Sequence, residues 1–89
     1  MAVKNHIALS DVASGAAKHT TLNAKSISWI RNDDAINAIL FNFEEGTDTS
    51  GAFKVGTGAT VSNIDLPVGT IYYTCTGATA AFSLFGIAR

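Results

Sequence analysis

The sequence predicts an all-β protein, a small antiparallel β-sandwich or barrel with an extended N-terminal arm. Short apolar segments with period-two alternation recur roughly every 8 to 12 residues, and glycine-rich turns separate them. β-Branched and aromatic residues dominate these segments, which favours strands over helices. The 89 residues suffice for one domain, and no internal repeat or interdomain linker divides them.

The N-terminal part, residues 1–25, differs in composition from the rest. It is rich in Ala, Ser and Thr and has few large apolar side chains, although the alternation in Val3–Ser10 suits a strand. We therefore expect residues 1–25 to form an arm or an edge strand that orders against a neighbouring protein. Residues 26–89 would form the sandwich domain. On this expectation, deletion of Met1–Lys25 leaves a folded domain and removes the contact with the neighbour.

The next segments have the pattern of strands. In Ser26–Arg31, alternation places Ile27 and Trp29 on one face, so we expect Trp29 to pack in the core. The stretch Ala35–Phe43 is apolar on both faces, which is typical of a central strand covered on both sides. A helix from Asp33 to Leu40 is the alternative for this stretch.

Two short strands are expected next. One surrounds Phe53 and Val55, after the acidic loop Glu44–Gly51. The other either ends at Pro67 or lies at a sheet edge, because proline cannot donate a hydrogen bond to a strand ladder.

The last two strands are expected to form a hairpin around Gly77–Thr79. Alternation gives each one an apolar face: Ile71, Tyr73 and Cys75 in the first, and Phe82 and Leu84, opposite Ser83, Phe85 and Ile87, in the second. A free edge as apolar as Ala80–Ala88 would aggregate. The final strand should therefore lie between two neighbours.

The composition argues for protein partners. Charged residues make up 15% of the chain, below the roughly 25% typical of globular proteins, and the net charge is −1. The Lys and Arg residues are far apart in the sequence, which argues against nucleic acid as a partner. No apolar run is long enough for a membrane span, and no signal peptide is visible. A weakly charged surface indicates self-assembly or a partner surface, with an unusually neutral monomer as the alternative.

The histidines and the cysteine do not form a metal-site pattern. His6 and His19 lie far from Cys75, and neither C-x-x-C nor H-x-x-x-H occurs. We expect surface histidines and no zinc. Cys75 should be a small buried apolar residue, and a single cysteine excludes an intrachain disulfide, which suits a reducing cytoplasm.

The acidic and glycine-rich stretches match no catalytic or ligand motif. Asp33-Asp34 and Glu44–Asp48 do not fit a calcium-binding loop, so solvated turns are expected, with a calcium site built by folding as the alternative. Val55–Val61 fits neither phosphate-binding motif and should be a turn or bulge. No nucleophile elbow is present. The sequence therefore assigns no catalytic, cofactor-binding or metal-binding residue and predicts a protein that is not an enzyme.

Two adjacent tyrosines leave one further possibility. Tyr72 and Tyr73 must point to opposite faces of a strand, so one of them should be exposed. An exposed aromatic ring on a β-face can stack against a sugar. A small carbohydrate-binding module is therefore an alternative function.

Several stretches between about residues 26 and 89 form a further pattern: a strand with an Asn-containing turn, a glycine-containing loop and a closing hairpin. The pieces are Arg31-Asn32, Gly56–Val61, Ile71-Tyr72, Thr76-Gly77-Ala78 and Gly86-Ile87-Ala88-Arg89. This pattern resembles the small β-sandwich structural proteins of tailed bacteriophages. The resemblance implies a virion component that decorates capsids or contributes to tails, and it carries over no catalytic residue.

The residues and the resemblance lead to one expectation. The chain would be a capsid decoration or cement protein, assembled in the host cytoplasm and located in the virion. Its partner would be the major capsid protein or another virion protein, and it would form homo-oligomers without nucleic acid, membrane or cofactor. A tail, baseplate or fibre component is the alternative within virions.

Overall fold

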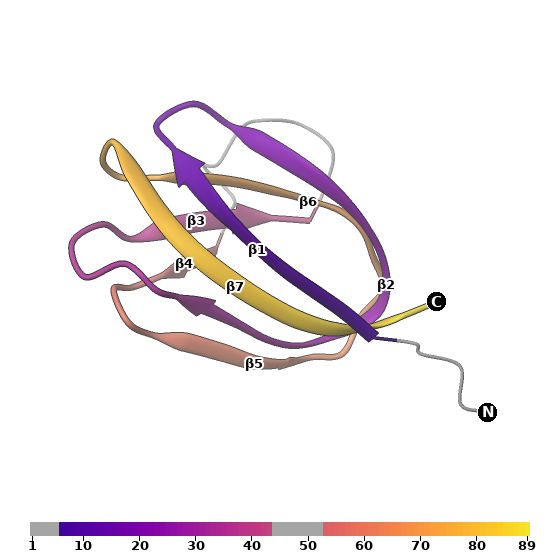
Figure 1. Ribbon diagram of the computed structural model, residues 1–89. Coiled ribbons are helices and arrows are strands. Elements are labelled where there is room, and N and C mark those ends of the chain that lie inside the picture. Colours follow the sequence, from indigo (N-terminus) through magenta and orange to yellow (C-terminus); the bar gives the residue numbers. More distant parts are fainter. Residues whose placement is uncertain (1–5, 44–52) are drawn as a thin grey trace.

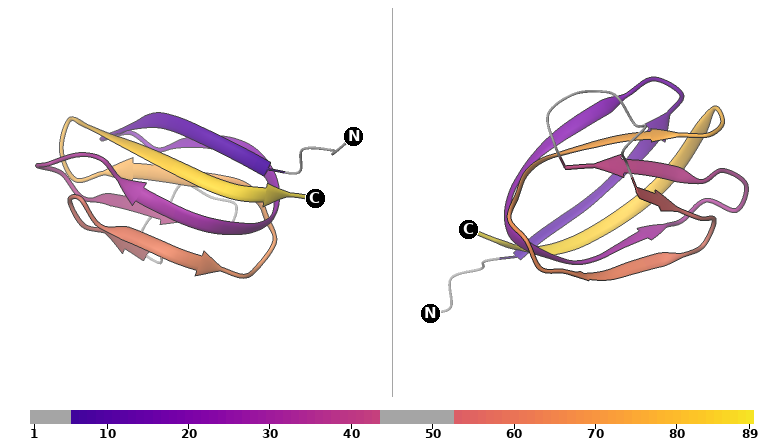
Figure 2. Two further views of the ribbon diagram at one scale, coloured as in Figure 1. Left: turned by 60° about the horizontal axis from the view of Figure 1, so that its bottom comes forward. Right: turned by 180° about the vertical axis from the view of Figure 1, so that it is seen from behind.

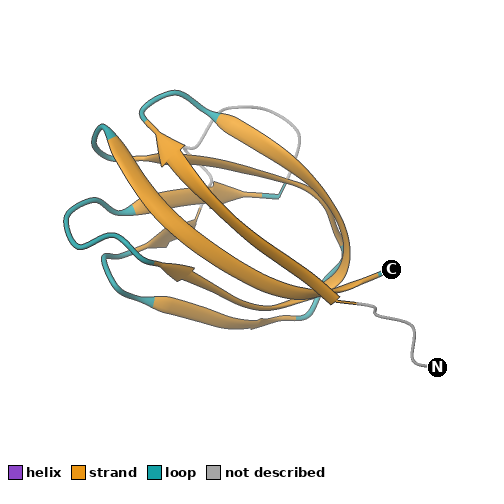
Figure 3. Cartoon of the chain, viewed as in Figure 1, coloured by secondary structure: helices purple, strands orange, loops and turns teal. Residues whose placement is uncertain are grey.

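The computed structural model describes residues 6–43 and 53–89, and this part of the chain consists of strands, turns and loops (Figure 3). The strands are β1 His6–Ser14, β2 Lys18–Asn32, β3 Ile39–Asn42, β4 Phe53–Val55, β5 Thr60–Ile64, β6 Val68–Cys75 and β7 Thr79–Ala88. All their pairings are antiparallel. The predicted all-β class is confirmed.

The strands form one sheet that folds over at β2. Their order is β1-β7-β2-β6-β3-β4, and β5 also pairs with β2. The first part of β2 pairs with β6, and the second part pairs with β7 and β5. The two halves of the sheet therefore face each other as a sandwich, with β1 and β7 on one side and β6 and β3 on the other (Figures 1 and 2).

Irregular backbone in β2 explains the fold-over. Its register against β7 shifts between Ala24 and Ser26 and again between Ile27 and Trp29, and its register against β6 shifts just before Ala24. Asn23 lies in the left-handed region with φ of 51°, which asparagine tolerates better than most residues. Bulges of this kind bend a strand and increase its twist, so one strand can serve both halves.

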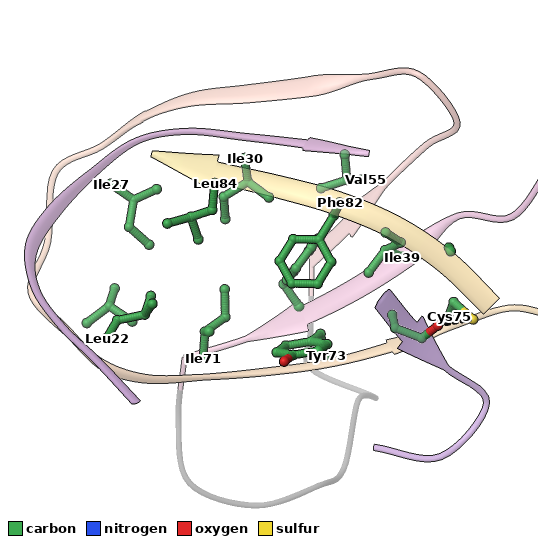
Figure 4. Close-up of a cluster of buried hydrophobic side chains, with 14 of the residues drawn as sticks. Leu22, Ile27, Ile30, Ile39, Val55, Ile71, Tyr73, Cys75, Phe82 and Leu84 are labelled. Atoms are coloured by element: carbon green, nitrogen blue, oxygen red, sulfur yellow. Dashed lines mark hydrogen bonds between the residues drawn. The ribbon is translucent and has the colours of Figure 1, made fainter. Parts of the chain in front are cut away.

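The core lies between the two halves (Figure 4). Phe82 of β7 meets Tyr73 of β6 and Phe41 of β3 edge-on, with ring centroids 4.8 and 5.1 Å apart. These rings join the halves at the centre of the sandwich. The other buried apolar residues are Ala13, Leu22, Ala24, Ile27, Ile30, Ile39, Val55, Val68, Ile71, Cys75, Ala80 and Leu84.

The expected hairpin of the last two strands is wrong, although their faces are as predicted. β6 pairs with β2 and β3, whereas β7 pairs with β1 and β2. The turn at Gly77 carries the chain from one half of the sandwich to the other. Alternation specifies which side chains face the core but does not name the neighbouring strand. The final strand does lie between two neighbours, as predicted.

The strand expected over Ala35–Phe43 is shorter in the structure, and the alternative helix does not form. Only Ile39–Asn42 is a strand, and it lies between β6 and β4. The preceding loop docks on the turn between β6 and β7: the Asn37 Nδ2 donates to the carbonyl of Thr79 at 3.0 Å, and the Thr76 N–H donates to the carbonyl of Ala38 at 3.0 Å. Ile36 in this loop is 83% exposed.

Asn32 fixes the start of that loop from inside the core. It is fully buried, and its Nδ2 donates to the carbonyl oxygens of Asn37 at 2.9 Å and Val55 at 3.1 Å. Its Oδ1 accepts the N–H of Asp34 at 2.8 Å. Every polar atom of this side chain is therefore paired, as burial demands.

Residues 6–25 belong to the sandwich. They form β1 and the first part of β2, and they contribute Ala13, Leu22 and Ala24 to the core. β1 is an edge strand, whereas the boundary expected at residue 25 falls inside β2. Deletion of Met1–Lys25 should therefore not leave a folded domain, contrary to the expectation from the sequence, because it removes core residues. Residues 1–5 lie outside the described part of the chain.

Candidate interaction surface

The histidines and the cysteine are placed as the sequence predicts. His6 and His19 are exposed on β1 and β2. Cys75 is buried, with its Sγ 3.3 Å from the carbonyl oxygen of Gly77 and 3.6 Å from that of Ala13. Over residues 6–43 and 53–89, no three His, Cys, Asp or Glu side chains come together in a way that could hold a metal ion.

The described acids of the loop after β2 stabilise that loop. Asp34 accepts the N–H groups of Asn37 and Ile36, and these two hydrogen bonds lower the pKa of the Asp34 carboxyl. Asp33 accepts from Arg31 at 2.6 Å and from the hydroxyl of Ser83 at 2.9 Å. Both carboxylates are thus engaged in the turn. The second acidic group, Glu44–Asp48, lies outside the described residues.

The glycine-rich stretch Val55–Val61 contains a turn, as predicted, over residues 56–59. It joins β4 to β5, and the N–H of Ala59 donates to the carbonyl of Gly56 at 3.0 Å. Gly58 has φ of 67°, a conformation in which a side chain would be strained.

The two tyrosines point to opposite faces. Tyr73 is buried in the core, and Tyr72 is half-buried on the outer face of the β6 half. The ring of Tyr72 lies beside His19, with 5.6 Å between the centroids.

Trp29 does not share the core with Ile27, contrary to the prediction. Ser28 is the extra residue of the β-bulge against β7, so the alternation changes phase at this point. Ile27 and Ile30 therefore both face the core, while Trp29 lies directly opposite Phe85 on the outer face. The sequence contains no clear signal of this bulge.

An outer face with little charge results, which we call the β7 face. It consists of the outward-pointing residues of β1, β7 and the second part of β2: His6, Ala8, Ser10, Val12, Ala81, Ser83, Phe85, Ile87, Trp29 and Arg31. Val12 and Ile87 are 44% and 43% exposed. Arg31 is the one member with a full charge, and Asp33 pairs with it at the margin.

A row of stacked groups crosses this face. The ring of Phe85 stacks on His6 of β1 at 5.7 Å and on Trp29 of β2 at 6.3 Å, with the planes within 20° of parallel. The guanidinium of Arg31 lies 5.4 Å from the Trp29 ring centroid. Each ring is held by its neighbours, so the row is a rigid apolar feature of the kind that protein interfaces favour.

A polar cluster connects β1 to the opposite half. The Tyr73 hydroxyl donates to Asp11 and lies 2.7 Å from the Thr20 hydroxyl, and Lys18 contacts the Asp11 carboxylate at 3.3 Å. The hydrogen bond from Tyr73 is the main cause that lowers the pKa of Asp11. Burial, followed by that same bond, raises the pKa of Tyr73.

These pKa shifts predict an acid-sensitive contribution to stability. Asp11 has a lower pKa in the folded state than its ordinary value near 3.8, so its contribution is complete above that value. It is lost as the pH falls through the folded pKa. We expect Tyr73→Phe to flatten the decrease in the free energy of unfolding below about pH 4. Urea titrations of both proteins between pH 2 and 7 would measure this, and identical slopes would contradict it.

A polar hollow lies where β5 runs beside β2. Its volume is about 250 Å³, and its lining residues are Ser26, Ile27, Ser28, Asn63, Ile64 and Asp65. The bulge residue Ser28 lies at this position, and Asn63 across from it has φ of 61°. The hollow is lined by hydroxyl, amide and carboxylate groups.

Comparison with known proteins identifies the fold alone. No protein-family model and no curated protein sequence matches the chain. RmlC from Streptococcus suis, solved with dTDP-D-xylose, superposes with a TM-score of 0.56 at 13% identity, over 96% of this chain and 45% of that one. A chain from Bacillus endospore appendages, which form disulfide-linked pili, superposes with a TM-score of 0.56 at 17% identity, over 98% and 88%. This chain thus spans less than half of RmlC.

Proposed function

We propose that this chain is a structural virion protein, a capsid decoration or cement subunit that binds its partner through the β7 face. The observation that carries the proposal is the largely apolar, partly exposed face around Phe85 and Trp29, in which Arg31 is the one charged member. An apolar surface of this kind marks a site of protein contact. The resemblance to small bacteriophage structural proteins supplies the virion context.

The mechanism would be burial of apolar area across subunit boundaries. A decoration subunit seated on neighbouring capsid proteins adds contacts that must break before the shell opens, and so opposes internal pressure. Val12 and Ile87 would be covered first, because they are the exposed apolar side chains of the face. The half-buried rings of Phe85 and Trp29 would supply a rigid base for the contact.

The similarity to the endospore appendage chain supports one limited point. A sandwich of this shape also serves in a repeating protein assembly, and the two chains correspond over nearly their whole lengths. Disulfide linkage is not part of our proposal, because the one cysteine, Cys75, is buried in the core.

The test compares two substitutions that each replace isoleucine by lysine. Ile87→Lys places a charge on the β7 face, and Ile36→Lys places the same charge on the exposed loop before β3, which is not part of that face. We expect Ile87→Lys to weaken binding to heads assembled without this protein by at least about tenfold, because an unpaired charge would be buried. Ile36→Lys should bind as the unchanged protein does. Co-sedimentation with the heads measures both.

The other outcomes decide between the alternatives. If Ile36→Lys abolishes binding and Ile87→Lys does not, the β7 face is not the contact surface. Binding to tails rather than heads would replace the decoration role by a tail role. Binding to neither, together with quenching of tryptophan or tyrosine fluorescence by a sugar, would favour the carbohydrate-binding alternative, with the half-buried Tyr72 as the residue to replace first.

A further inference from the structure

β1 presents an unpaired backbone edge. It pairs with β7 along its whole length without a register shift, and it has no strand on its other side. The N–H of Val12 donates to Asp11 Oδ1 at 2.8 Å, and its carbonyl accepts from Lys18 at 3.1 Å, so the backbone of Val12 points away from β7. Because this direction alternates along a strand, the backbone groups of His6, Ala8 and Ser10 also point away from β7.

Within the described part of the chain, side chains cover the backbone groups at the Val12–Ser14 end of this edge but not those at the His6–Ser10 end. Side chains occupy the backbone groups of Val12, and the Thr74 hydroxyl donates to the carbonyl of Ser14 at 3.0 Å. Within residues 6–43 and 53–89, no side chain bonds the outward backbone groups of Ala8 and Ser10. A regular, uncharged edge without such cover is a template for pairing with another strand.

The other described edges carry the features that prevent strand pairing. β5 contains Asn63 in the left-handed region and is soon followed by Pro67. The first part of β2 contains Lys18 and the irregular Asn23, and β4 has three residues. Charge, irregular backbone and short length each discourage edge pairing. The absence of these features from His6–Ser10 is therefore specific to β1.

We propose that a second copy of this chain pairs with β1 in antiparallel orientation, about a two-fold axis at Ala8. The closed backbone of Val12 sets this register, because it restricts pairing to His6, Ala8 and Ser10. Ala8 then lies opposite Ala8 of the second copy, and His6 lies opposite Ser10. Each such pair exchanges two backbone hydrogen bonds, about six in all.

The side chains fit this arrangement. On the inner face, the partly buried Ile7 of one copy lies opposite Leu9 of the other, so both lose exposed apolar surface. On the outer face, Ala8 is small and uncharged at the axis, where like charges would repel. Such a contact uses the same surface on both copies, so it closes as a dimer. The proposed dimer rests on the backbone of β1 and does not depend on the proposed virion role.

Cysteine cross-linking tests both the partner and the register. Ala8→Cys places two thiols directly opposite each other, with Cα atoms about 5.5 Å apart, which is within the range of a disulfide. Ser10→Cys is the matched control, because the two introduced thiols would be about 14 Å apart. We expect mild oxidation of dilute protein to give a covalent dimer of Ala8→Cys only. The unchanged protein controls for Cys75, which is buried.

Solution mass provides the second measurement. The unchanged chain should sediment at twice its 9.3 kDa mass, and Ala8→Lys should remain monomeric at tenfold higher concentration with an unchanged far-ultraviolet circular dichroism spectrum. Two results would overturn the proposal. One is a monomer throughout a dilution series of the unchanged protein, which would leave the edge to a different protein. The other is Ser10→Cys cross-linking as readily as Ala8→Cys.

Discussion

Asn32→Asp should lower the free energy of unfolding by about 3 to 5 kcal/mol at pH 7. The substitution keeps the shape of the side chain and its acceptor for the Asp34 N–H. It replaces the two donated hydrogen bonds by a carboxylate that faces the carbonyl oxygens of Asn37 and Val55. Because Asn32 is fully buried, water cannot compensate for the lost donors. Urea denaturation followed by circular dichroism would measure the loss.

The control for this prediction is Asn63→Asp. It adds the same charge, but Asn63 is exposed on β5, and aspartate also tolerates its left-handed backbone. We expect a change of less than about 0.5 kcal/mol there. Lowering the pH should restore part of the stability of Asn32→Asp, because protonation removes the charge from the core. Equal losses in the two variants would mean that net charge, and not the lost donors, is responsible.

The sequence predicts the faces of the regular strands well. Alternation correctly places Ile71, Tyr73 and Cys75 of β6 in the core and Phe85 of β7 outside it. A strand with one buried face must alternate, so this information is local. The exclusion of Pro67 from a central strand is equally local, since proline lacks the N–H that a ladder needs: β5 ends at Ile64 and, among the described strands, pairs with β2 alone.

Pairing and bulges are not local, and the predictions that depend on them are wrong. The alternation in β2 changes phase at Ser28. Ile30 is therefore in the core, where the sequence predicted Trp29. The two last strands have the pattern of a hairpin, yet the turn at Gly77 crosses the sandwich. A strand that serves both halves of a folded sheet cannot be distinguished by its pattern from two separate strands.

The β7 face could not be predicted from the sequence, because it also depends on strand pairing. Phe85 and Trp29 are 56 positions apart in number, and only the register of β7 against β2 places them opposite each other. The low charge of the chain did indicate an association surface, but composition does not locate it. The pattern behind the bacteriophage resemblance places Asn32 in a turn, whereas in the structure three hydrogen bonds join its buried side chain to other backbone positions.

The open edge of β1 and the β7 face lie next to each other. The outward side chains of β1 belong to the face, and its outward backbone groups form the edge. A dimer through β1 would therefore join two β7 faces side by side without covering Ile87. The two proposals predict separable effects, because Ala8→Lys acts on the axis and Ile87→Lys acts on the face.

Deletion of Met1–Lys25 should abolish cooperative folding. It removes β1, the first part of β2 and the buried Ala13, Leu22 and Ala24, and it leaves the edges of β6 and β7 unpaired. The Tyr73 hydroxyl also loses both of its hydrogen-bond partners, Asp11 and Thr20. A domain of this size has little stability in reserve, so we expect no melting transition and the far-ultraviolet circular dichroism of an unfolded chain. Deletion of Met1–Asn5 is the control, because it removes no residue of the seven strands described between His6 and Ala88, and it should melt cooperatively. A cooperative transition in the longer deletion would instead restore the interpretation of this segment as an arm.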